Sequence, residues 1–497
     1  MIPIPKPEDF DVSSENGFLP TQPPLEALPD SYYEPWEYVV KNLQGLILSK
    51  RLREVVDKLP VLSTDRLFGE PQWRRAYSVL AFISHAYIWG GKRPAERVPP
   101  PISIPFLATC DHLELPAVAT YAGLVLWNWK PIFDSEQVDT LANLDMIDTF
   151  TGSLDEKWFY LVSVAIEAKG GALIPLMLHA IQAAGRGDSK TVTQCLRTFA
   201  ERLDQIGLTL TRMYDECDPH VFYHRIRPFL AGSKNMADAG LPNGIIFDDG
   251  GPMNKQRYVQ FSGGSNAQSS IIQFFDLVLS VEHRPTGDKK QDATASDTDV
   301  PAQRPTTKQP PKPNFIHEMR AYMPGAHARF LRAVGDVANI RPFVQSRRPH
   351  ERELTVAFDA CIAMLSALRD KHIQMVSRYI IVKSREAANK KKEGSGLPAV
   401  EKTKDATKVN LASRPKDGQG ETKKALKGTG GSSLIPFLQQ ARNETGEPAV
   451  EAWSRRLLVK QRGGKVEKME DGGSGEECKG LSGVWKVEES GGGLCLY

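Results

Sequence analysis

Cysteine is scarce in this chain and follows no disulfide or metal-binding pattern. No two cysteines form a CxxC pair, and the six stand at positions 110, 195, 217, 361, 478 and 495. Chains that rely on a disulfide framework or a cysteine-rich zinc site space their cysteines more regularly. The pattern therefore disfavours both and is typical of a reducing compartment.

A large excess of one charge is also missing. Lys and Arg number 63 and Asp and Glu 60 among 497 residues, so the net charge is only +3. Proteins that bind nucleic acids or membrane surfaces through charge carry a clear basic bias. We therefore expect no nucleic acid and no membrane among the partners.

Long apolar runs are absent as well. The N-terminus reads MIPIPKPEDFDVSSENGF, with prolines and acidic residues where a signal peptide needs an apolar segment. No apolar stretch reaches the roughly 18 uncharged residues that a membrane-spanning helix requires. These absences predict a soluble, cytoplasmic protein.

Alternating apolar and polar residues, which mark β-strands, are scarce outside a short stretch near residues 244–247. Most of the remaining chain spaces its apolar residues as an α-helix does. The sequence therefore predicts an all-α fold, with helices at residues 36–59, 74–89, 114–129, 157–183, 189–217, 314–334 and 353–383.

Two helix starts carry local signals. The predicted helix at 114–129 begins at LELP, where Pro116 suits a first turn. Ser265, followed three residues later by Gln268, forms a capping-box pattern before IIQFFDLVLSVEH. We expect a helix to follow each signal.

Three polar segments are predicted to be disordered, because they cannot bury enough apolar surface to offset their ordering entropy. They are two surface insertions, at 286–313 and 383–424, and a C-terminal tail at 463–497. The remainder is expected to form a small helical domain at 1–127, a connecting segment at 128–151 and a larger helical domain at 152–460.

One histidine lies on the apolar face of a periodic helical segment, RDKHIQMVSRYIIV. Relative to His372, the apolar residues of that face are Leu365, Leu368, Met375, Val376 and Tyr379. A buried imidazole without a partner costs roughly 1–3 kcal/mol. A metal, a haem iron, or a neighbouring carboxylate or carbonyl could each be that partner.

Small and aromatic residues mark further candidate sites. In KWFYLVSVAIEAKGG, Ser163 lies one turn after Phe159, and Gly170 and Gly171 would let a flat ligand or another backbone approach. In HVFYHRIRPFLAG, aromatic residues beside Arg227 suit a planar substrate that bears a carboxylate. Close helix packing and an ordinary surface arginine are the alternatives.

Two glycine-rich stretches could serve a ligand. FSGGSNAQSS has N–H groups that suit an anion, although a plain turn explains the same residues. LKGTGGSSL could close over a ligand, with its backbone and the Thr429 hydroxyl meeting polar atoms. Asp276, which follows the first stretch, stands among apolar residues and therefore needs a cationic partner.

Seven segments resemble the indoleamine 2,3-dioxygenase family. They are, in order, LPDSYYEPWEYV, LELPAVATYAGLVLWNW, FYLVSVAIEA, SGGSNAQSSIIQFFD, MRAYMPGAHARFL, RDKHIQMVSRYI and KGTGGSSL. The resemblance covers about residues 20–438 apart from the two insertions, and looks like the fungal branch. It implies a haem b enzyme that adds both atoms of O2 across the indole C2–C3 bond of L-tryptophan. The product would be N-formylkynurenine, in the first step of the kynurenine pathway to NAD.

The resemblance implies roles for residues on the haem side. His372 would be the proximal ligand of the haem iron. Arg369 would serve a haem propionate and pair with Asp276, which supports the cofactor from behind. Ser265 would also belong to the cofactor-binding set.

On the distal side, the resemblance implies two catalytic residues. Ser163 would stand above the iron, and Arg227 would pair with the tryptophan carboxylate. The substrate-binding set, which lines the indole or contacts the amino acid moiety, would be Tyr121, Phe159, Phe222, Tyr223, Arg227, Gly264 and Thr429.

The chain departs from the family pattern at three pocket positions. Tyr223 stands where a phenylalanine is found, Asn266 where an alanine follows GGS, and Leu124 where a cysteine is found. These changes touch the pocket, so they bear on the choice and affinity of the substrate more than on the chemistry.

Two other functions stay open. A haem-binding or haem-sensing paralogue without turnover would keep His372, Arg369 and Asp276 but would not need Arg227 or Thr429. A helical interaction scaffold would use His372 and Asp276 as ordinary core pairs. For the enzyme, the expected partners are tryptophan or a related indoleamine, O2 and an electron donor that keeps the iron ferrous, and the expected state is a monomer.

Overall fold

The computed structural model describes residues 3–285, 314–393, 434–459, 477–480 and 483–486. Helices dominate this part of the chain, and its few strands are two to four residues long. They form three separate two-stranded sheets. The all-α prediction is confirmed.

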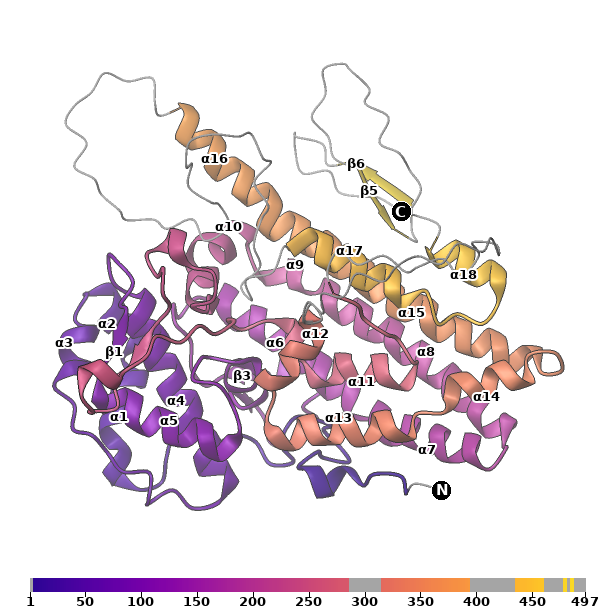
Figure 1. Ribbon diagram of the computed structural model, residues 1–497, viewed down its shortest axis with the longest axis horizontal. Coiled ribbons are helices and arrows are strands. Elements are labelled where there is room, and N and C mark those ends of the chain that lie inside the picture. The colour runs from indigo at the N-terminus through magenta and orange to yellow at the C-terminus, as the bar shows by residue number, and fades with distance from the viewer. Residues whose placement is uncertain (1–2, 286–313, 394–433, 460–476, 481–482, 487–497) are drawn as a thin grey trace, which may run out of the picture.

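A first group of helices gathers at one side of the molecule, in indigo and purple (Figure 1). Its longest member, α4, is buried along most of its length and packs against α5. The group consists of α1 (Glu34–Lys41), α2 (Leu43–Leu48), α3 (Leu52–Asp57), α4 (Gly69–Trp89) and α5 (Pro100–Leu113).

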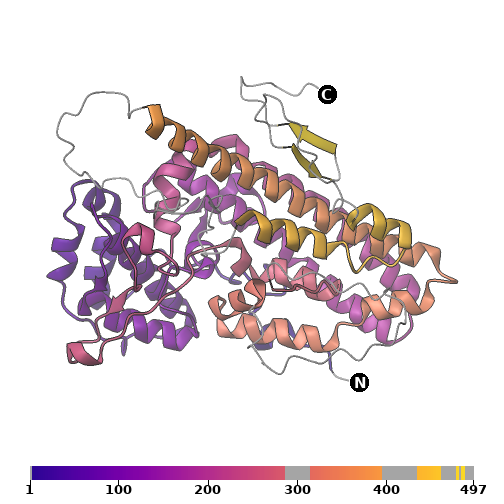
Figure 2. The same ribbon diagram turned by 45° about the horizontal axis from the view of Figure 1, so that its top comes forward.

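A second, larger group is built on two long neighbours, α8 (Ser189–Thr211) and α15 (Arg352–Val376), which run parallel and side by side in both views (Figures 1 and 2). A π-helical turn, Ser377–Val382, joins α15 to α16 (Lys383–Glu393) in one long helical line. The other members are α6 (Leu154–Gly171), α7 (Leu173–Gly185), α11 (Ser270–Val278), α13 (Gly325–Val337), α14 (Ile340–Arg347), α17 (Leu434–Thr445) and α18 (Ala452–Val459).

Two chain segments connect these groups. Strand β1 (Arg97–Val98) pairs in parallel with β4 (Ile246–Phe247), although 147 residues separate their ends along the sequence, from 99 to 245. The N-terminal segment lies beside α13, where Phe10 and Phe18 contact Phe330 at ring-centroid distances of 5.7 and 5.9 Å (Figure 1). The predicted domain boundaries at 127 and 151 stay a prediction.

The predicted helix at 114–129 is wrong for most of its length. Glu114 has a φ of 55°, a left-handed conformation that ends α5. Pro116 therefore follows a helix end and does not begin a helix. The helical part of this segment is a single π-helical turn, Ala122–Leu126, whereas α5 was not predicted.

The predicted helix at 36–59 is broken into α1, α2 and α3. Lys50 takes a φ of 60° between the second and third pieces, and an α-helix cannot continue through that conformation. Apolar spacing alone does not reveal such a break, because the spacing of buried residues resumes after it.

Parts of the predicted disordered segments are ordered. Residues 383–393 form α16, since a helix that is already nucleated by α15 propagates into a polar sequence at low cost. In the predicted tail, β5 (Glu477–Gly480) and β6 (Gly483–Lys486) form an antiparallel pair that sets Glu477 opposite Lys486. The insertion at 286–313 and most of the second, 394–424, lie outside the described residues.

The stretch Leu154–Gly185 is long and apolar enough, by length and composition alone, to cross a membrane. However, 72% of its most apolar window is buried inside the protein. It comprises α6 and α7, which pack against α8. That burial is typical of core helices in a globular fold.

Candidate functional site

His372 lies on α15 with the apolar neighbours that the helical spacing predicts, all of them buried. Burial, with the nearby charge of Arg369, lowers the pKa of His372 to about 4, so the imidazole is neutral. The ring nevertheless keeps some exposed surface, and no hydrogen bond joins it to another described residue. A neutral, unbonded imidazole that keeps some exposed surface suits coordination of an iron.

Arg369 stands one helical turn before His372 and forms a two-pronged ion pair with Asp276 of α11. Its Nη2 lies 2.8 and 2.7 Å from the two carboxylate oxygens. Burial alone would raise the pKa of Asp276, but the charges of Arg369 and His283 outweigh it and lower that pKa. The structure thus brings together the two residues that the resemblance implies for the propionate side.

The Asp276 carboxylate belongs to a larger polar cluster that was not predicted. The His283 ring lies between Asp276 Oδ2, at 3.1 Å, and Glu444 Oε2 of α17, at 2.8 Å. Arg369 also donates to the hydroxyl of Thr445. The cluster ties α11, α15 and α17 together behind His372.

Aromatic rings extend from the His372 helix to α6. Tyr379, two turns beyond His372, has its ring centroid 5.6 Å from Phe222, and Phe222 lies 4.8 Å from Phe159. Phe159 precedes Ser163 by one turn of α6. The predicted indole-lining residues Phe159 and Phe222 are therefore in contact with each other.

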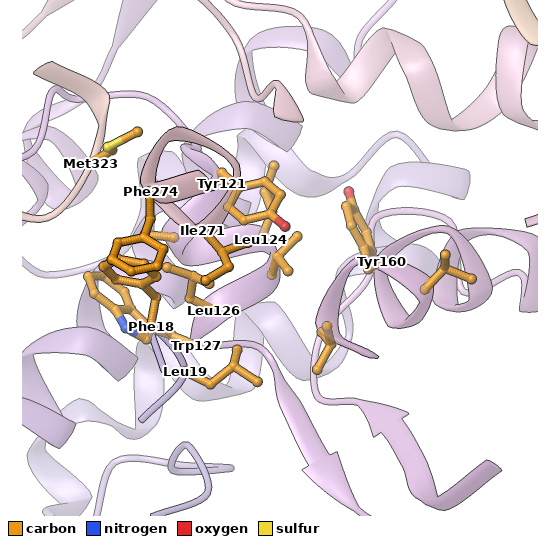
Figure 3. Close-up of a cluster of buried hydrophobic side chains, with 14 of the residues drawn as sticks. Phe18, Leu19, Tyr121, Leu124, Leu126, Trp127, Tyr160, Ile271, Phe274 and Met323 are labelled. Atoms are coloured by element: carbon orange, nitrogen blue, oxygen red, sulfur yellow. The ribbon is translucent and has the colours of Figure 1, made fainter. Parts of the chain in front are cut away.

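Ser163 shares a buried polar cluster with Tyr121, whose phenol interacts with Ser163, Glu167 and Ser269. The backbone N–H of Tyr121 donates to Gln268 at 2.9 Å. Figure 3 draws Tyr121 with Leu124 and Ile271 in one cluster of buried hydrophobic side chains. The structure therefore joins two predicted site residues and adds Glu167 and Gln268, which were not predicted.

Arg227 is 2% exposed and lies at the junction of a π-helical turn, Phe222–Ile226, and a 3-10 turn, Arg227–Leu230. Its guanidinium carbon is 5.7 Å from the centre of the Tyr223 ring. Burial lowers the pKa of Arg227, although the group keeps its charge at neutral pH. A buried cation beside aromatic rings can receive a carboxylate without competition from bulk water.

The 263–269 loop passes directly over Leu124. A side chain at Gly264 would place its Cβ 2.8 Å from Leu124 Cδ1, so only glycine fits here without a shift. The Gly264 N–H donates to the carbonyl of Leu230 at 3.1 Å. Gly264 therefore lies between the Tyr121 segment and the Arg227 segment.

The predicted capping role of Ser265 is wrong in register. Ser265 caps a short 3-10 turn, Asn266–Gln268, by accepting the Ala267 N–H at 3.3 Å. The cap of α11 is Ser269, whose hydroxyl accepts the Ile272 N–H at 3.4 Å. Asn266 is exposed, so this departure from the family pattern points away from the interior.

A second unpredicted residue, His85 of α4, joins the two substrate-side segments. Its Nδ1 donates to the Phe229 carbonyl and its Nε2 accepts the Ala119 N–H, both at 2.8 Å. These partners lie two residues from Arg227 and two from Tyr121. Burial lowers the pKa of His85 to about 4, which keeps it in the neutral form that both bonds require.

The glycine pair of α6 serves helix packing. A Cβ on Gly171 would lie 2.6 Å from the backbone of Asn16, and one on Gly170 would lie 2.5 Å from Ile271. The N-terminal backbone and α11 therefore occupy the space that a flat ligand would need. Thr429 lies outside the described residues.

The residues present fit a haem held by one protein ligand. Within the described ranges, no three His, Cys, Asp or Glu side chains cluster as a protein-only metal site. His372 offers the unbonded neutral imidazole, and Arg369, supported by Asp276, offers a cation one turn away for a propionate.

Comparison with known proteins identifies the family. The family model for indoleamine 2,3-dioxygenase matches residues 6–448. An indoleamine 2,3-dioxygenase of Saccharomyces cerevisiae is 39% identical over 90% of this chain and 94% of its own length. A 6-hydroxytryptophan 2,3-dioxygenase of Fusarium equiseti is 36% identical over 88% and 97%, and indoleamine 2,3-dioxygenase 1 of Mus musculus 33% over 90% and 96%. The chain therefore belongs to the indoleamine 2,3-dioxygenase family, haem-dependent oxidoreductases that act on tryptophan-like indoles with O2.

Proposed function

We propose that this protein converts L-tryptophan and O2 to N-formylkynurenine, the first step of the kynurenine pathway. The observation that carries the proposal is the His372 imidazole, which is neutral, partly buried and unbonded within the described chain. Its helix reaches the aromatic pair Phe159 and Phe222 through Tyr379. The proposed iron ligand and the aromatic pair are thus linked through the π-helical turn that follows α15.

Haem b would be held by His372 at the iron and by Arg369 at a propionate. When bound, it supplies the activation of O2 and the addition of both oxygen atoms to the indole. Asp276 keeps Arg369 in place through its two-pronged ion pair. An electron donor that keeps the iron ferrous belongs to the proposal.

The distal residues would bind and orient the substrate. Arg227, buried beside the Tyr223 ring, would pair with the tryptophan carboxylate, and Phe159 and Phe222 would contact the indole. Gly264 and Thr429 would contact the amino acid moiety. Fixing the amino acid in this way brings C2 of the indole toward the reacting oxygen and removes the entropy cost of orientation from the reaction step.

Ser163 would shape the distal face without an obligatory proton transfer. It is 7% exposed and lies near the Tyr121 phenol. A histidine at this place could act as a proton donor and favour the reduction of O2 to water. A serine hydroxyl is a poorer acid and leaves both oxygen atoms for the substrate.

The proposal also covers the state and place of the protein. We expect a monomeric cytoplasmic enzyme with no nucleic-acid or membrane partner, in line with the near-neutral net charge of +3. The alternatives from the sequence are a haem-binding paralogue without turnover and a helical interaction scaffold.

The test is turnover by the purified, haem-reconstituted protein under reducing conditions with air. L-Tryptophan, D-tryptophan and 6-hydroxytryptophan would be supplied separately, and mass spectrometry would follow the gain of two oxygen atoms. N-formylkynurenine from L-tryptophan at the highest kcat/KM is the expected result. A histidine-ligated haem spectrum with no product would favour the non-catalytic paralogue, and no haem binding would favour the scaffold.

A further inference from the structure

Glu167 is a fully buried carboxyl one helical turn after Ser163 on α6. Its exposed fraction is 0%. Oε1 accepts a hydrogen bond from the Ser269 hydroxyl at 2.6 Å. Oε2 has no hydrogen-bond partner. A buried polar atom left in this way costs free energy unless a proton, a water or a neighbour satisfies it.

The Tyr121 phenol is the group nearest to satisfying Oε2. It interacts with Glu167, Ser269 and Ser163, yet its contact with Glu167 does not meet the geometry of a hydrogen bond. The backbone of Tyr121 is held independently by Gln268. The Tyr121 phenol therefore lies between Glu167 and Ser163 and interacts with both.

No charged side chain acts on Glu167 among the described residues. The side chains that influence the pKa of Glu167 are Ser269, at the N-terminus of α11, and Tyr121, from the segment packed against α6. Of these two, only Tyr121 is titratable. Burial raises the pKa of Glu167 to about 7. The ionised form is thus an uncompensated buried charge, and the protonated form gains a donor at Oε2.

We propose that Glu167 is a positioning residue that binds a proton at Oε2 and thereby sets the direction of the hydrogen bonds that run through Tyr121 to Ser163. The proton comes from solvent, and no redox change accompanies it. The functional consequence rests on the proposed function, in which Tyr121 and Ser163 face the substrate. The protonation itself does not depend on it.

The two protonation states present different distal surfaces. When Glu167 is protonated, Oε2–H donates to the Tyr121 oxygen, and the Tyr121 O–H donates to Ser163. The Ser163 O–H is then free to point toward the ligand. When Glu167 is ionised, the Tyr121 O–H donates to it, Ser163 donates to Tyr121, and lone pairs of Ser163 face the ligand instead. The Ser163 oxygen therefore changes from a hydrogen-bond donor to a hydrogen-bond acceptor toward the ligand.

Infrared pH-difference spectroscopy of the whole, haem-free protein tests the proton directly. We expect a carbonyl band of a protonated carboxylic acid that grows as the pH falls through neutrality and shifts in D2O. The band disappears in Glu167→Gln. Failure of any such band to titrate near neutral pH, or its survival in Glu167→Gln, overturns the proposal.

Glu156 provides the matched control. It is also 0% exposed and also on α6, but its carboxylate accepts three hydrogen bonds, from the Phe150 N–H at 2.8 Å and from the Thr151 N–H and hydroxyl at 2.6 Å. The band assigned to Glu167 is expected to persist in Glu156→Gln. Its loss there would assign the proton to Glu156 and overturn the proposal.

Tyr121→Phe tests the connection and keeps the Glu167 carboxyl, so it remains informative if Glu167→Gln fails to fold. Removal of the phenol oxygen should shift the acid band to higher frequency, because the Oε2–H loses its acceptor. An unmoved band overturns the connection to Tyr121. In the haem-loaded protein, the C–O stretch of bound carbon monoxide should depend on pH in the wild type and become independent of pH in Tyr121→Phe. A stretch that keeps its pH dependence overturns the link to the distal face.

Absence of haem binding would refute the proposed function, while the haem-free spectra would still decide the protonation of Glu167. The two failures are therefore distinguishable.

Discussion

At the scale of single residues, the two sides of the site depend on buried groups of opposite character. His372 is an imidazole that burial keeps neutral, whereas Arg227 stays a cation although it is 2% exposed. A neutral imidazole is the form that binds iron, and a buried guanidinium is the form that recognises a carboxylate. Substitutions at these two positions should therefore produce different defects.

Replacing His372 with alanine should abolish stable haem binding. The methyl group cannot coordinate iron, and the ring has no hydrogen bond to another described residue whose loss would unfold the protein. The Soret absorbance of the reconstituted, purified variant is the measurement. His327→Gln, a change at another buried histidine, should keep its haem, and a full Soret band in His372→Ala would remove His372 from the axial position.

Replacing Arg227 with alanine should raise the KM for tryptophan by roughly 10- to 100-fold, the loss of one charge-assisted contact of about 1.5–3 kcal/mol. Arg227→Lys should give an intermediate KM, because it keeps the charge and loses the planar fork. Haem content should stay normal in both. An unchanged KM in Arg227→Ala would show that the carboxylate binds elsewhere.

At the scale of elements, the site is assembled where short segments meet, and glycine allows the closest approach. Gly264 of the 263–269 loop lies next to Leu124, which follows Tyr121, and its N–H donates to the carbonyl of Leu230, which follows Arg227. His85 of α4 holds the Tyr121 and Arg227 segments together by hydrogen bonds at both ring nitrogens. A methyl group added at Gly264 would therefore displace the end of the Leu124 side chain.

Gly264→Ala should weaken substrate binding, because the added Cβ would lie 2.8 Å from Leu124 Cδ1 and displace the Leu124 side chain. The double variant with Leu124→Ala should recover part of the lost affinity, which a double-mutant cycle on KM would measure as coupling. The control is Gly335→Ala on α13, where the nearest atom is 3.5 Å away. That change should leave KM unaltered, and strictly additive effects of the first pair would contradict the contact.

At the scale of the whole molecule, the haem-side cluster joins segments that are far apart in sequence. Asp276, His283, Arg369 and Glu444 bring α11, α15 and α17 together through hydrogen bonds of 2.7–3.1 Å. Burial lowers the pKa of His283, but its two carboxylate partners outweigh this effect. The pKa is raised overall by the charge and hydrogen bond of Asp276 and by the hydrogen bond of Glu444. The stability of the large helical group should therefore depend on pH.

His283→Gln should lower the free energy of unfolding by about 1–3 kcal/mol at acidic pH, the cost of losing a charged buried hydrogen-bond partner. Because the folded-state pKa is raised, the stabilisation is fully present below the unfolded pKa, near 6.5, and is lost as the pH rises through the folded pKa. Denaturant melts of both proteins across this range are the measurement. A difference that grows with increasing pH would contradict the sign.

Much of the helical content followed from the sequence, because the spacing of apolar residues is a local property. The apolar face around His372 is an example, since its neighbours at three, four and seven residues are buried as the spacing predicts. The ends of the helices were harder to predict from the sequence. Glu114 and Lys50 adopt left-handed conformations that no residue type there demands, so the helices at 114–129 and 36–59 were predicted in the wrong form.

The candidate site shows the same division. Resemblance in ordered segments placed His372, Arg369, Asp276, Ser163 and Arg227 in roles, because family motifs conserve residue type and order. Glu167 had a visible signal, four residues after Ser163 in an apolar helix, and His85 and His283 had none beyond their residue type.

The sequence by itself therefore determined the helical class, the family and the helix face on which His372 lies. These properties depend on residues that are close together along the chain or on the order of the motifs. Only the tertiary structure decided that Tyr121, Ser163, Glu167 and Ser269 meet, and that His283 bridges Asp276 and Glu444. Most of these contacts join segments that are about 40 to 160 residues from each other along the sequence. The contact between Asp276 and His283 is local. Nothing in the local pattern of either segment specifies its distant partner, so packing of the whole chain has to supply it.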